Sequence, residues 1–510
     1  MINYQDPQCA GQRLWIGIPS TELDSATIEL LQELKPGGII LFRRNIDSAD
    51  QVRRLTRDLR KWAGESLHIC IDQEGGRVVR FPDGITFFPG NMALGSLACS
   101  DPEVALELAF AQGWHTGMEL LELGIDINLA PCIDLVASPH SRGIGSRSFG
   151  SDPQRALALA SALGRGMRSA GVRDCWKHFP GLGRVTVDPH FGLPATDPEE
   201  SASDLIPFGG AEEAGASIVM TSHVIARALD ADLPVTISSR AVNHLRSGLK
   251  FSGVVMTDCL EMGGVSGLSP EEVAKGAMAA GHDVLLVSHT PDLQRAIHHR
   301  IEKEIEDESA PHLQSLQRIS ALAAATEIPA DSPKPIPLLT GEEVARKICR
   351  GGVSLLQGRL PETPLTGGWS LVVPEQFSHS PVEDSRSSAE LDLLAHELPM
   401  VSRTLRFDSP EQLARLASAE NELMTEENLL LALQGARLDS RYREVLEALA
   451  KSLDSLVVLL LDDSRDLVAM PEADNLSVLC AHGARPLHLK TLSEVLRGEI
   501  PPGSGQPIGN

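Results

Sequence analysis

Short runs of apolar residues alternate with longer amphipathic stretches through the first two-thirds of the chain. Such runs are typical of buried parallel strands, and the amphipathic stretches are typical of the helices that connect them. Eight runs are present, beginning at Leu14, Gly37, His68, Ile125, Asp174, Ser217, Gly253 and Asp283. Eight β/α units in about 300 residues predict an α/β fold with an N-terminal TIM (β/α)8-type barrel.

Several of the amphipathic stretches open with residues that typically start helices. Asp101-Pro102, Asp152-Pro153 and Ser269-Pro270 each combine a side chain that caps free backbone N–H groups with a proline that suits the first helical turn. We therefore expect helices to begin at these three places, between the predicted strands.

A chain of 510 residues is too long for one ordinary domain, because single hydrophobic cores stop growing at roughly 250–300 residues. The barrel pattern ends near Asp307, and the proline-bearing stretch 328–340 is typical of a stiff linker. Residues 341–510 mix helix-like and strand-like segments, which predicts a smaller α/β sandwich-like domain, and the tail 501–510 is predicted to be disordered. The expected barrel domain is residues 1–327.

The composition excludes several classes of partner. A formal net charge of −24 disfavours nucleic acid, and 4% aromatic residues offer few platforms for stacking bases. No run of about 18 apolar residues predicts a membrane span, and no cationic segment before an apolar stretch predicts a secretory signal. The eight cysteines include no CxxC pair, as expected in a reducing compartment. We therefore expect a cytoplasmic protein without a structural zinc site, and the composition leaves its oligomeric state open.

Most of the apolar runs turn polar at their carboxyl ends. In a TIM barrel these ends share one rim, where catalytic groups collect. The polar residues are Asp72, Glu74, Lys177, His178, Ser222, His223, Asp258, Ser288 and His289. A single charged strand end could simply be a solvated rim, but several that converge on one rim favour a functional site.

The sharpest local signal is the segment KHFPGLG from Lys177 to Gly183, which is followed by Asp188-Pro189-His190. Asp188 and His190 are two positions apart on a loop, so both can project to one side. A carboxylate bonded to one imidazole nitrogen fixes the tautomer and raises the basicity of the other nitrogen, as acid/base catalysis requires. The alternative is a loop histidine without a chemical role.

Two further stretches can carry chemistry. The run VVMTD ends in Asp258, where a carboxylate could act on an anomeric carbon, although an aspartate there could also cap a following turn. The stretch IDQEGGRVVR delivers Asp72 and Glu74 into a glycine turn before Arg77 and Arg80. Carboxylates and guanidinium groups together can orient a pyranose, or they can form a structural cluster of salt bridges at the rim.

Together with GSRSFG at 145–150 and ALDADLPVTIS at 228–238, these stretches resemble the family 3 glycoside hydrolases. The most similar branch is the bacterial β-N-acetylhexosaminidases, which carry a KH(F/I)PG(H/N)G…DxH loop. The resemblance covers about residues 12–300 in order. It implies a retaining exo-β-N-acetylglucosaminidase that acts on cell-wall (peptidoglycan) turnover fragments or chitooligosaccharides.

The resemblance also implies roles for single residues. Asp258 would be the nucleophile, and His190 with Asp188 would be the acid/base dyad. The residues that would hold the non-reducing N-acetylglucosamine are Asp72, Arg80, Arg147, Lys177 and His178. The partner would be a small saccharide, no metal or organic cofactor would be required, and residues 341–510 would have no catalytic duty.

Two positions depart from the pattern of the family that the chain resembles. Position 182 is Leu where His or Asn is usual, and position 189 is Pro where a small polar residue is common. Pro189 fixes its own φ and favours an extended Asp188, so we expect a stiffer loop. Neither departure removes a member of the dyad.

Two alternatives remain at this point. One is a β-N-acetylglucosaminide phosphorylase, because an Asp–His acid/base adds less negative charge than a glutamate and could admit phosphate as acceptor. The other is a catalytically silent sugar-binding protein, which the two loop departures make conceivable. Retention of Asp188, His190 and Asp258 favours an enzyme.

Overall fold

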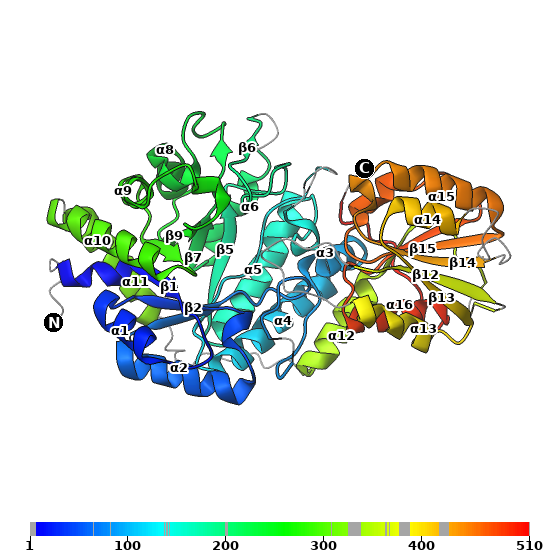
Figure 1. Cartoon of the computed structure of the whole chain (residues 1–510), viewed down its shortest axis with the longest axis horizontal. Coiled ribbons are helices and arrows are strands. Elements are labelled where there is room, and N and C mark those ends of the chain that lie inside the picture. The colour runs from blue at the N-terminus through cyan, green and yellow to red at the C-terminus, as the bar shows by residue number, and fades with distance from the viewer. Residues whose placement is uncertain are drawn as a thin grey trace.

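The computed structural model shows a barrel and a smaller sheet domain, arranged along the long axis of the molecule (Figure 1). It describes residues 7–64, 66–81, 83–136, 138, 141, 143–198, 202–307, 309–324, 338–362, 365–366, 368–376, 388–417 and 428–508. Most of the predicted linker at 328–340 lies outside the described residues.

Eight parallel strands close the barrel. They are β1 (Leu14–Gly17), β2 (Gly38–Leu41), β3 (His68–Ile71), β4 (Ile127–Asn128), β5 (Arg173–Phe179), β7 (Ile218–Thr221), β9 (Val254–Cys259) and β10 (Val284–Val287). They follow one another around the barrel in chain order. Each of the eight apolar runs forms one strand, so the predicted TIM-type barrel is confirmed.

Helices surround the barrel on its outside (Figure 1). They are α1 (Ser25–Leu34), α2 (Ala49–Ala63), α3 (Asn91–Ser100), α4 (Pro102–Glu122), α5 (Pro153–Ser169), α6 (Leu205–Gly209), α7 (Ala211–Ala214), α8 (Ser239–Asn243), α9 (Pro270–Ala280), α10 (Pro291–Asp307) and α11 (Ser309–Ala324). The three predicted helix starts are confirmed, because the side chains of Asp101, Asp152 and Ser269 accept hydrogen bonds from the first turns of α4, α5 and α9.

The strands bury alternate residues on two sides. In β10, Val284 and Leu286 belong to the apolar cluster inside the barrel, whereas Leu285 and Val287 pack against the outer helices. This alternation follows from the two-residue period of a strand. Helix α11 adds Leu322 to the inner cluster, and the carbonyl of the same residue accepts from Arg173 Nε at 3.1 Å at the start of β5. Helix α11 therefore closes the amino-terminal end of the barrel.

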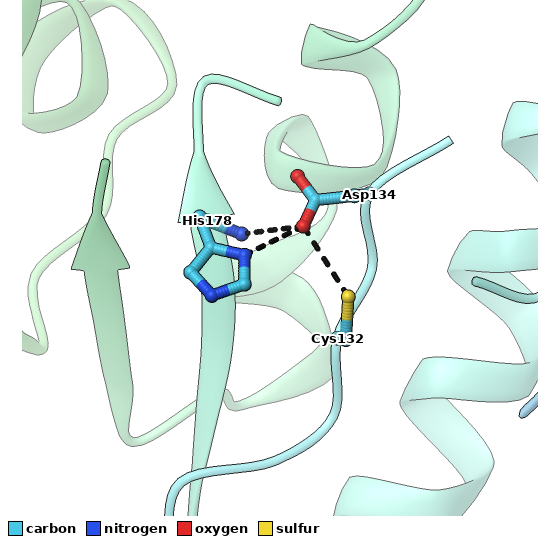
Figure 2. Close-up of side chains that lie close together, drawn as sticks. All are labelled: Cys132, Asp134 and His178. Carbon is cyan, nitrogen blue, oxygen red and sulfur yellow. Dashed lines mark hydrogen bonds and ion pairs between the residues drawn. The ribbon is translucent and has the colours of Figure 1, made fainter. Parts of the chain in front are cut away.

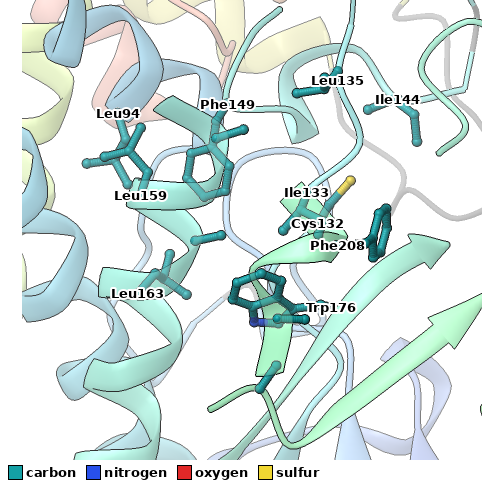
Figure 3. Packing of buried hydrophobic residues seen from close by; sticks show 14 of the residues in the cluster. Leu94, Cys132, Ile133, Leu135, Ile144, Phe149, Leu159, Leu163, Trp176 and Phe208 are labelled. Carbon is teal, nitrogen blue, oxygen red and sulfur yellow. The ribbon is translucent and has the colours of Figure 1, made fainter. Parts of the chain in front are cut away.

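A second layer of apolar residues joins the barrel to α3, α4 and α5 (Figure 3). Trp176 projects outward from β5 into this layer, where Leu163 of α5 also packs. The same cluster takes in Val344 and Ile348 of α12 (Gly341–Gly352), the first helix of the second domain. Helix α12 therefore packs into the apolar layer of the barrel domain, whereas the sheet of the second domain has apolar clusters of its own.

The C-terminal domain is a six-stranded sheet between two layers of helices. Besides α12, its elements are β11 (Ser354–Gln357), β12 (Trp369–Pro374), α13 (Asp392–Glu397), β13 (Val401–Phe407), α14 (Pro410–Leu416), β14 (Asn428–Leu433), α15 (Arg441–Ser452), β15 (Ser455–Leu460), β16 (Leu476–Cys480) and α16 (Pro486–Leu496). The strand order is β11-β16-β15-β14-β12-β13, and only β11 is antiparallel. Helices α13 and α16 cover one face, and α14 and α15 cover the other, which confirms the predicted α/β sandwich.

The C-terminal tail is not disordered over residues 501–508, so that prediction is wrong. Gly503 N–H donates to the Val353 carbonyl at 2.8 Å, and Ser151 N–H donates to the Pro507 carbonyl at 3.0 Å. Ile508 is buried in the cluster that also contains Phe149. The polar, glycine-rich composition gives no local sign of order, because the partners that hold the tail come from both domains.

Among the described residues, no helix has the length and hydrophobicity needed to cross a membrane.

Candidate active site

A pocket opens at the carboxyl ends of the barrel strands. Its volume is about 410 Å³, and it lies between the ends of β2, β3, β5, β9 and β10. All eight residues that the sequence indicates as site residues line it, namely Asp72, Arg80, Arg147, Lys177, His178, Asp188, His190 and Asp258. These residues come from distant parts of the chain, and they meet because parallel strands of a barrel end at one rim.

Five charged side chains form a continuous series of ion pairs beside the pocket. Arg147 donates from Nε and Nη2 to the two carboxylate oxygens of Glu74, each at 2.9 Å. Lys177 Nζ lies 2.6 Å from Glu74 and 2.7 Å from Asp72. Arg80 reaches the other oxygen of Asp72 at 3.3 Å. All five side chains are buried, so each charge depends on its neighbours to offset the loss of water.

The alternation of charges keeps these groups ionised. Burial by itself would raise the pKa of Asp72, but Lys177 and Arg80 outweigh it and hold that pKa below its ordinary value. Burial would likewise raise the pKa of Glu74, yet Arg147 and Lys177 hold it well below the usual range. Asp72 and Glu74 in turn raise the pKa of Lys177 against the effect of burial. The wall of the pocket therefore offers charged donors and acceptors that can orient sugar hydroxyl groups.

Asp134 orients His178, although the sequence did not single Asp134 out. Its Oδ2 accepts from the backbone N–H of His178 at 3.2 Å and from the Nδ1 of the ring at 2.7 Å (Figure 2). Its Oδ1 accepts from the backbone N–H of Leu182 at 2.7 Å. Because the N–H at Nδ1 of His178 donates to Asp134, Nε2 of the ring is left to accept a hydrogen bond from a bound molecule.

Cys132, Asp134 and His178 are also residue types that can bind a metal ion, and their ligand atoms lie close together. The Cys132 thiol donates to Oδ2 of Asp134 at 3.3 Å. Burial and the charge of Asp134 raise the pKa of that thiol well above its ordinary value. A metal would require the thiolate and would displace the hydrogen bonds that Asp134 accepts (Figure 2). The contacts fit a support for His178 better than a metal centre.

Asp188 and His190 lie on the loop that follows β5. Oδ1 of Asp188 accepts from the backbone N–H of His190 at 2.9 Å and from its Nδ1 at 2.7 Å. The side chain of His190 is 25% exposed, whereas that of Asp188 is 9% exposed. Because Nδ1 donates to a shielded carboxylate, Nε2 is the nitrogen that can exchange a proton with a bound molecule.

The loop that carries His190 is bonded to the turn that follows β9. Gly263 N–H donates to the His190 carbonyl at 3.2 Å, and Gly264 N–H donates to the Pro189 carbonyl at 2.8 Å. Asp258 stands near the carboxyl end of β9. These two bonds therefore hold the Asp–His pair next to the strand end that delivers Asp258.

Asp258 is half-buried in the pocket, and its Oδ1 accepts from the backbone N–H of Cys259 at 2.7 Å. It caps no following helix, because the next helical turn is preceded by Met262. His223, at the end of the neighbouring strand, bonds to the Cys259 carbonyl through Nε2 at 2.8 Å. Burial lowers the pKa of His223, so this histidine braces the strand end as a neutral ring.

The two departures from the expected loop pattern leave its contacts in place. Leu182 lines the pocket and packs with Val185, while its backbone N–H holds Asp134. Pro189 contributes its carbonyl oxygen to Gly264. Both contacts use backbone groups that leucine and proline retain, so the two departures leave the anchoring of the loop in place.

The family described as "Glycosyl hydrolase family 3 N terminal domain" matches residues 13–322, which span the whole barrel. The chain belongs to glycoside hydrolase family 3. It is therefore an enzyme that hydrolyses glycosidic bonds.

Several known proteins resemble the chain over one domain or both. A "Beta-hexosaminidase" of Stenotrophomonas maltophilia (strain K279a) is 39% identical over 292 residues, which cover 56% of this chain and 86% of that protein. A solved family 3 β-N-acetylglucosaminidase from Paenibacillus sp. str. FPU-7 has 31% identity and a TM-score of 0.87, and covers 99% of this chain and 98% of its own. The β-N-acetylhexosaminidase from Beutenbergia cavernae DSM 12333 has 28% identity and a TM-score of 0.56, over 64% of this chain and 99% of its own.

Proposed function

We propose that this glycoside hydrolase is a retaining exo-β-N-acetylglucosaminidase, which releases terminal β-linked N-acetylglucosamine from a saccharide. The family supports hydrolysis of a glycosidic bond. The names of similar proteins support the acetamido sugar, because they include a beta-hexosaminidase and a β-N-acetylglucosaminidase. The reaction needs no metal or organic cofactor.

The observation that carries this proposal is the attachment of the His190 loop to the turn after Asp258. The bonds from Gly263 to His190 and from Gly264 to Pro189 keep an Asp–His pair beside a carboxylate in one pocket. A retaining glycosidase needs a carboxylate that attacks the anomeric carbon and a second group that transfers a proton. Asp258 and His190 are suited to these two roles.

In the first step, we expect protonated His190 to donate its Nε2 proton to the glycosidic oxygen while Asp258 attacks the anomeric carbon. The leaving group departs as an alcohol, and the sugar stays bound to Asp258 through an ester. In the second step, neutral His190 takes a proton from water, which attacks the same carbon and releases Asp258. Asp188 supports both steps, because its carboxylate holds Nδ1 and stabilises the imidazolium.

The remaining predicted residues would hold the sugar. Asp72 is ionised between Lys177 and Arg80, so its oxygens can accept from hydroxyl groups while the cations donate to others. Arg147 is fixed by both oxygens of Glu74, and His178, which lines the pocket, has its Nδ1 bonded to Asp134 and keeps Nε2 for a sugar group. A pyranose bound by these groups would present its anomeric carbon to Asp258.

We infer that the natural substrates are cytoplasmic fragments of peptidoglycan turnover, with N-acetylglucosamine on an anhydro-muramic residue, or chitooligosaccharides. The resemblance to bacterial β-N-acetylhexosaminidases supports this class. Eight cysteines without a CxxC pair support a reducing compartment.

The deciding experiment compares 4-nitrophenyl β-N-acetylglucosaminide with the β-glucoside, for the wild type, Asp258→Asn and His190→Ala. We expect the wild type to cleave only the acetamido sugar, and the first product to be the β-anomer in a time-resolved NMR spectrum. Loss of the nucleophile should abolish turnover, and loss of the acid/base should lower kcat by about 10²-fold or more. Repeating the assay with phosphate tests the phosphorylase, which would instead release a sugar 1-phosphate.

Matched controls come from the exposed surface. Asp292 has a side chain that is 98% exposed, and His299 has one that is 81% exposed. Asp292→Asn and His299→Ala should keep wild-type activity. Full activity in Asp258→Asn would exclude the proposed nucleophile. A folded wild type that binds N-acetylglucosamine but cleaves neither substrate, with or without phosphate, would instead be a silent sugar-binding protein.

A further inference from the structure

Asp462 belongs to the C-terminal domain, yet both of its carboxylate oxygens bind the barrel. It follows β15 and is 5% exposed. Its Oδ1 accepts from the hydroxyl of Ser146 at 2.8 Å, and its Oδ2 pairs with Nη1 of Arg77 at 2.9 Å. A buried carboxylate with two such partners fixes them relative to each other, because each bond is directional and shielded from water.

Both partners stand in segments that lead to the sugar-binding wall of the pocket. Ser146 is adjacent to Arg147, in the helical turn that begins at Gly145. Arg77 lies in the turn between Glu74 and Arg80. Asp462 therefore ties together, from outside the barrel, the two loops whose side chains meet in the Arg147–Glu74 pair.

The packing at this junction is tight. Gly145 has a φ of +54°, and a Cβ built on it would lie 2.4 Å from Nη1 of Arg77 and 3.5 Å from Oδ2 of Asp463. Only glycine therefore allows the Arg77 guanidinium to reach Asp462 beside the turn that carries Arg147. Because of this close approach, a shift of the C-terminal domain would also shift the turn that carries Arg147.

A second contact from the same segment reaches the other side of the pocket. Arg465 Nη1 donates to the carbonyls of Ser138 at 3.0 Å and Ser141 at 2.9 Å. The next described residue along this stretch, Gly143, lines the pocket close to the dyad, since a Cβ there would lie 3.9 Å from the Asp188 carboxyl carbon. The segment after β15 thus supports the wall behind Asp188 as well.

The supporting segment is itself held firmly. Asp463 caps the 3₁₀ helix Ser464–Ala469 and pairs with Arg465 through Nε at 2.8 Å. Asp466 accepts from the backbone N–H of Gly435 at 2.6 Å and from Arg437 Nη1 at 2.9 Å. Burial opposes ionisation of Asp463, but the two arginines hold its pKa well below the usual range. These bonds anchor the segment to the sheet of the C-terminal domain.

We propose that Asp462 is a positioning residue for the reaction, through which the C-terminal domain holds Arg147 in its sugar-binding place. The residues that line the pocket, among those the structure describes, all come from the barrel, so the domain acts through Ser146 and Arg77 and touches no substrate. This inference rests on the proposed sugar-binding role of Arg147. The inference gives residues 341–510 a role in substrate binding, although the resemblance implies no catalytic group in that domain.

The test measures KM for 4-nitrophenyl β-N-acetylglucosaminide and the inhibition constant of N-acetylglucosamine for the wild type, Ser146→Ala and Asp462→Asn. Asp462→Asn removes the negative charge that pairs with the Arg77 guanidinium, so we expect both constants to rise about tenfold, and about threefold in Ser146→Ala. The value of kcat should change by less than about twofold. A merely structural role would lower the folded fraction and kcat but leave KM unchanged.

A matched control breaks an ion pair inside the same domain. Glu494 pairs with Arg350 at 2.8 Å away from the barrel pocket, so Glu494→Gln should leave KM and the inhibition constant unchanged. In the double variant of Ser146→Ala and Asp462→Asn, KM should equal that of Asp462→Asn alone, because the hydroxyl acts through the carboxylate.

A folded Asp462→Asn with wild-type KM and inhibition constant would overturn the inference and leave the proposed function standing. If Asp462→Asn does not fold, Ser146→Ala decides alone, since a raised KM supports the inference and an unchanged KM overturns it. If the wild type is inactive, the proposed function fails. Calorimetric binding of N-acetylglucosamine to the same variants then still decides whether Asp462 positions the sugar site.

Discussion

Gly263 lies so close to His190 that a Cβ at position 263 would stand 2.7 Å from the His190 carbonyl oxygen. The backbone N–H of the same glycine donates to that oxygen. The absence of a side chain at position 263 therefore allows the loop that carries His190 to lie against the turn after β9.

Replacing Gly263 by alanine should displace the His190 loop and lower kcat by at least about tenfold, because small shifts of a proton-transfer group are costly. Gly267 is the matched control in the same turn, since a Cβ there meets nothing within 4 Å. Gly267→Ala should keep wild-type kcat. Steady-state kinetics of both variants on the nitrophenyl substrate measures the difference, and equal kcat values would show that the close contact between Gly263 and the His190 loop is not needed.

Replacing Glu74 by glutamine should destabilise the protein strongly. The carboxylate lies between Arg147 and Lys177, and its removal leaves two buried cations short of a partner. Breaking a buried pair typically costs about 3–5 kcal/mol. The exposed pair of Arg295 and Glu33, at 2.9 Å, gives the control, because Glu33→Gln should cost less than about 1 kcal/mol. Urea unfolding measures both, and a similar small change in both would contradict the argument.

Replacing Asp188 by alanine should affect poor leaving groups more than good ones. Without the carboxylate, the His190 imidazolium loses its partner at Nδ1, so protonation of the glycosidic oxygen becomes harder. A nitrophenolate leaves without a proton, whereas a sugar alcohol does not. We expect kcat to fall about 10²-fold or more on chitobiose and clearly less on the nitrophenyl substrate. An equal loss on both would argue against a role of Asp188 in protonating the leaving group, and would restrict it to the second step, which both substrates share, or to holding the loop.

Acid should weaken the fold through buried histidines. Burial lowers the pKa of His282 to about 4, and its Nε2 bonds to the hydroxyl of Thr221 at 2.8 Å. In the unfolded chain the ring titrates near pH 6.5, so between about pH 6.5 and 4 the unfolded state binds more protons. The free energy of unfolding therefore decreases as pH falls through this window, by up to roughly 3 kcal/mol for this one group.

Urea unfolding at pH 7 and pH 5 checks this prediction. His282→Asn keeps a donor for the Ala277 carbonyl, which Nδ1 bonds at 3.1 Å in the wild type, but it cannot titrate. The variant should lose less stability than the wild type between the two pH values. The control, His299→Asn at an exposed position, should retain the wild-type slope. A slope unchanged in His282→Asn would refute the assignment.

The barrel could be predicted from the sequence because its signals are local. The two-residue alternation within each strand and the caps at Asp101, Asp152 and Ser269 act over a few positions. The polar strand ends also indicated where the pocket would lie, since parallel strands in a closed barrel share one rim. The particular roles assigned to Asp258 and His190 depended on the resemblance to a family, because single strand ends and loop histidines have structural uses as well.

Only the tertiary structure decided which groups support the site. Asp134 and His178 are 44 positions apart, and Asp462 and Ser146 are 316 apart. The sequence around each of these residues contains no pattern that predicts its partner. The same holds for the tail, whose order depends on backbone groups of both domains. Whether a segment forms a strand or a helical turn depends mainly on residues close by in the sequence. The partners of a buried carboxylate depend on which donors the completed fold brings next to it. The sequence by itself therefore determined the barrel and its rim, whereas only the tertiary structure decided the contacts that hold the rim in place.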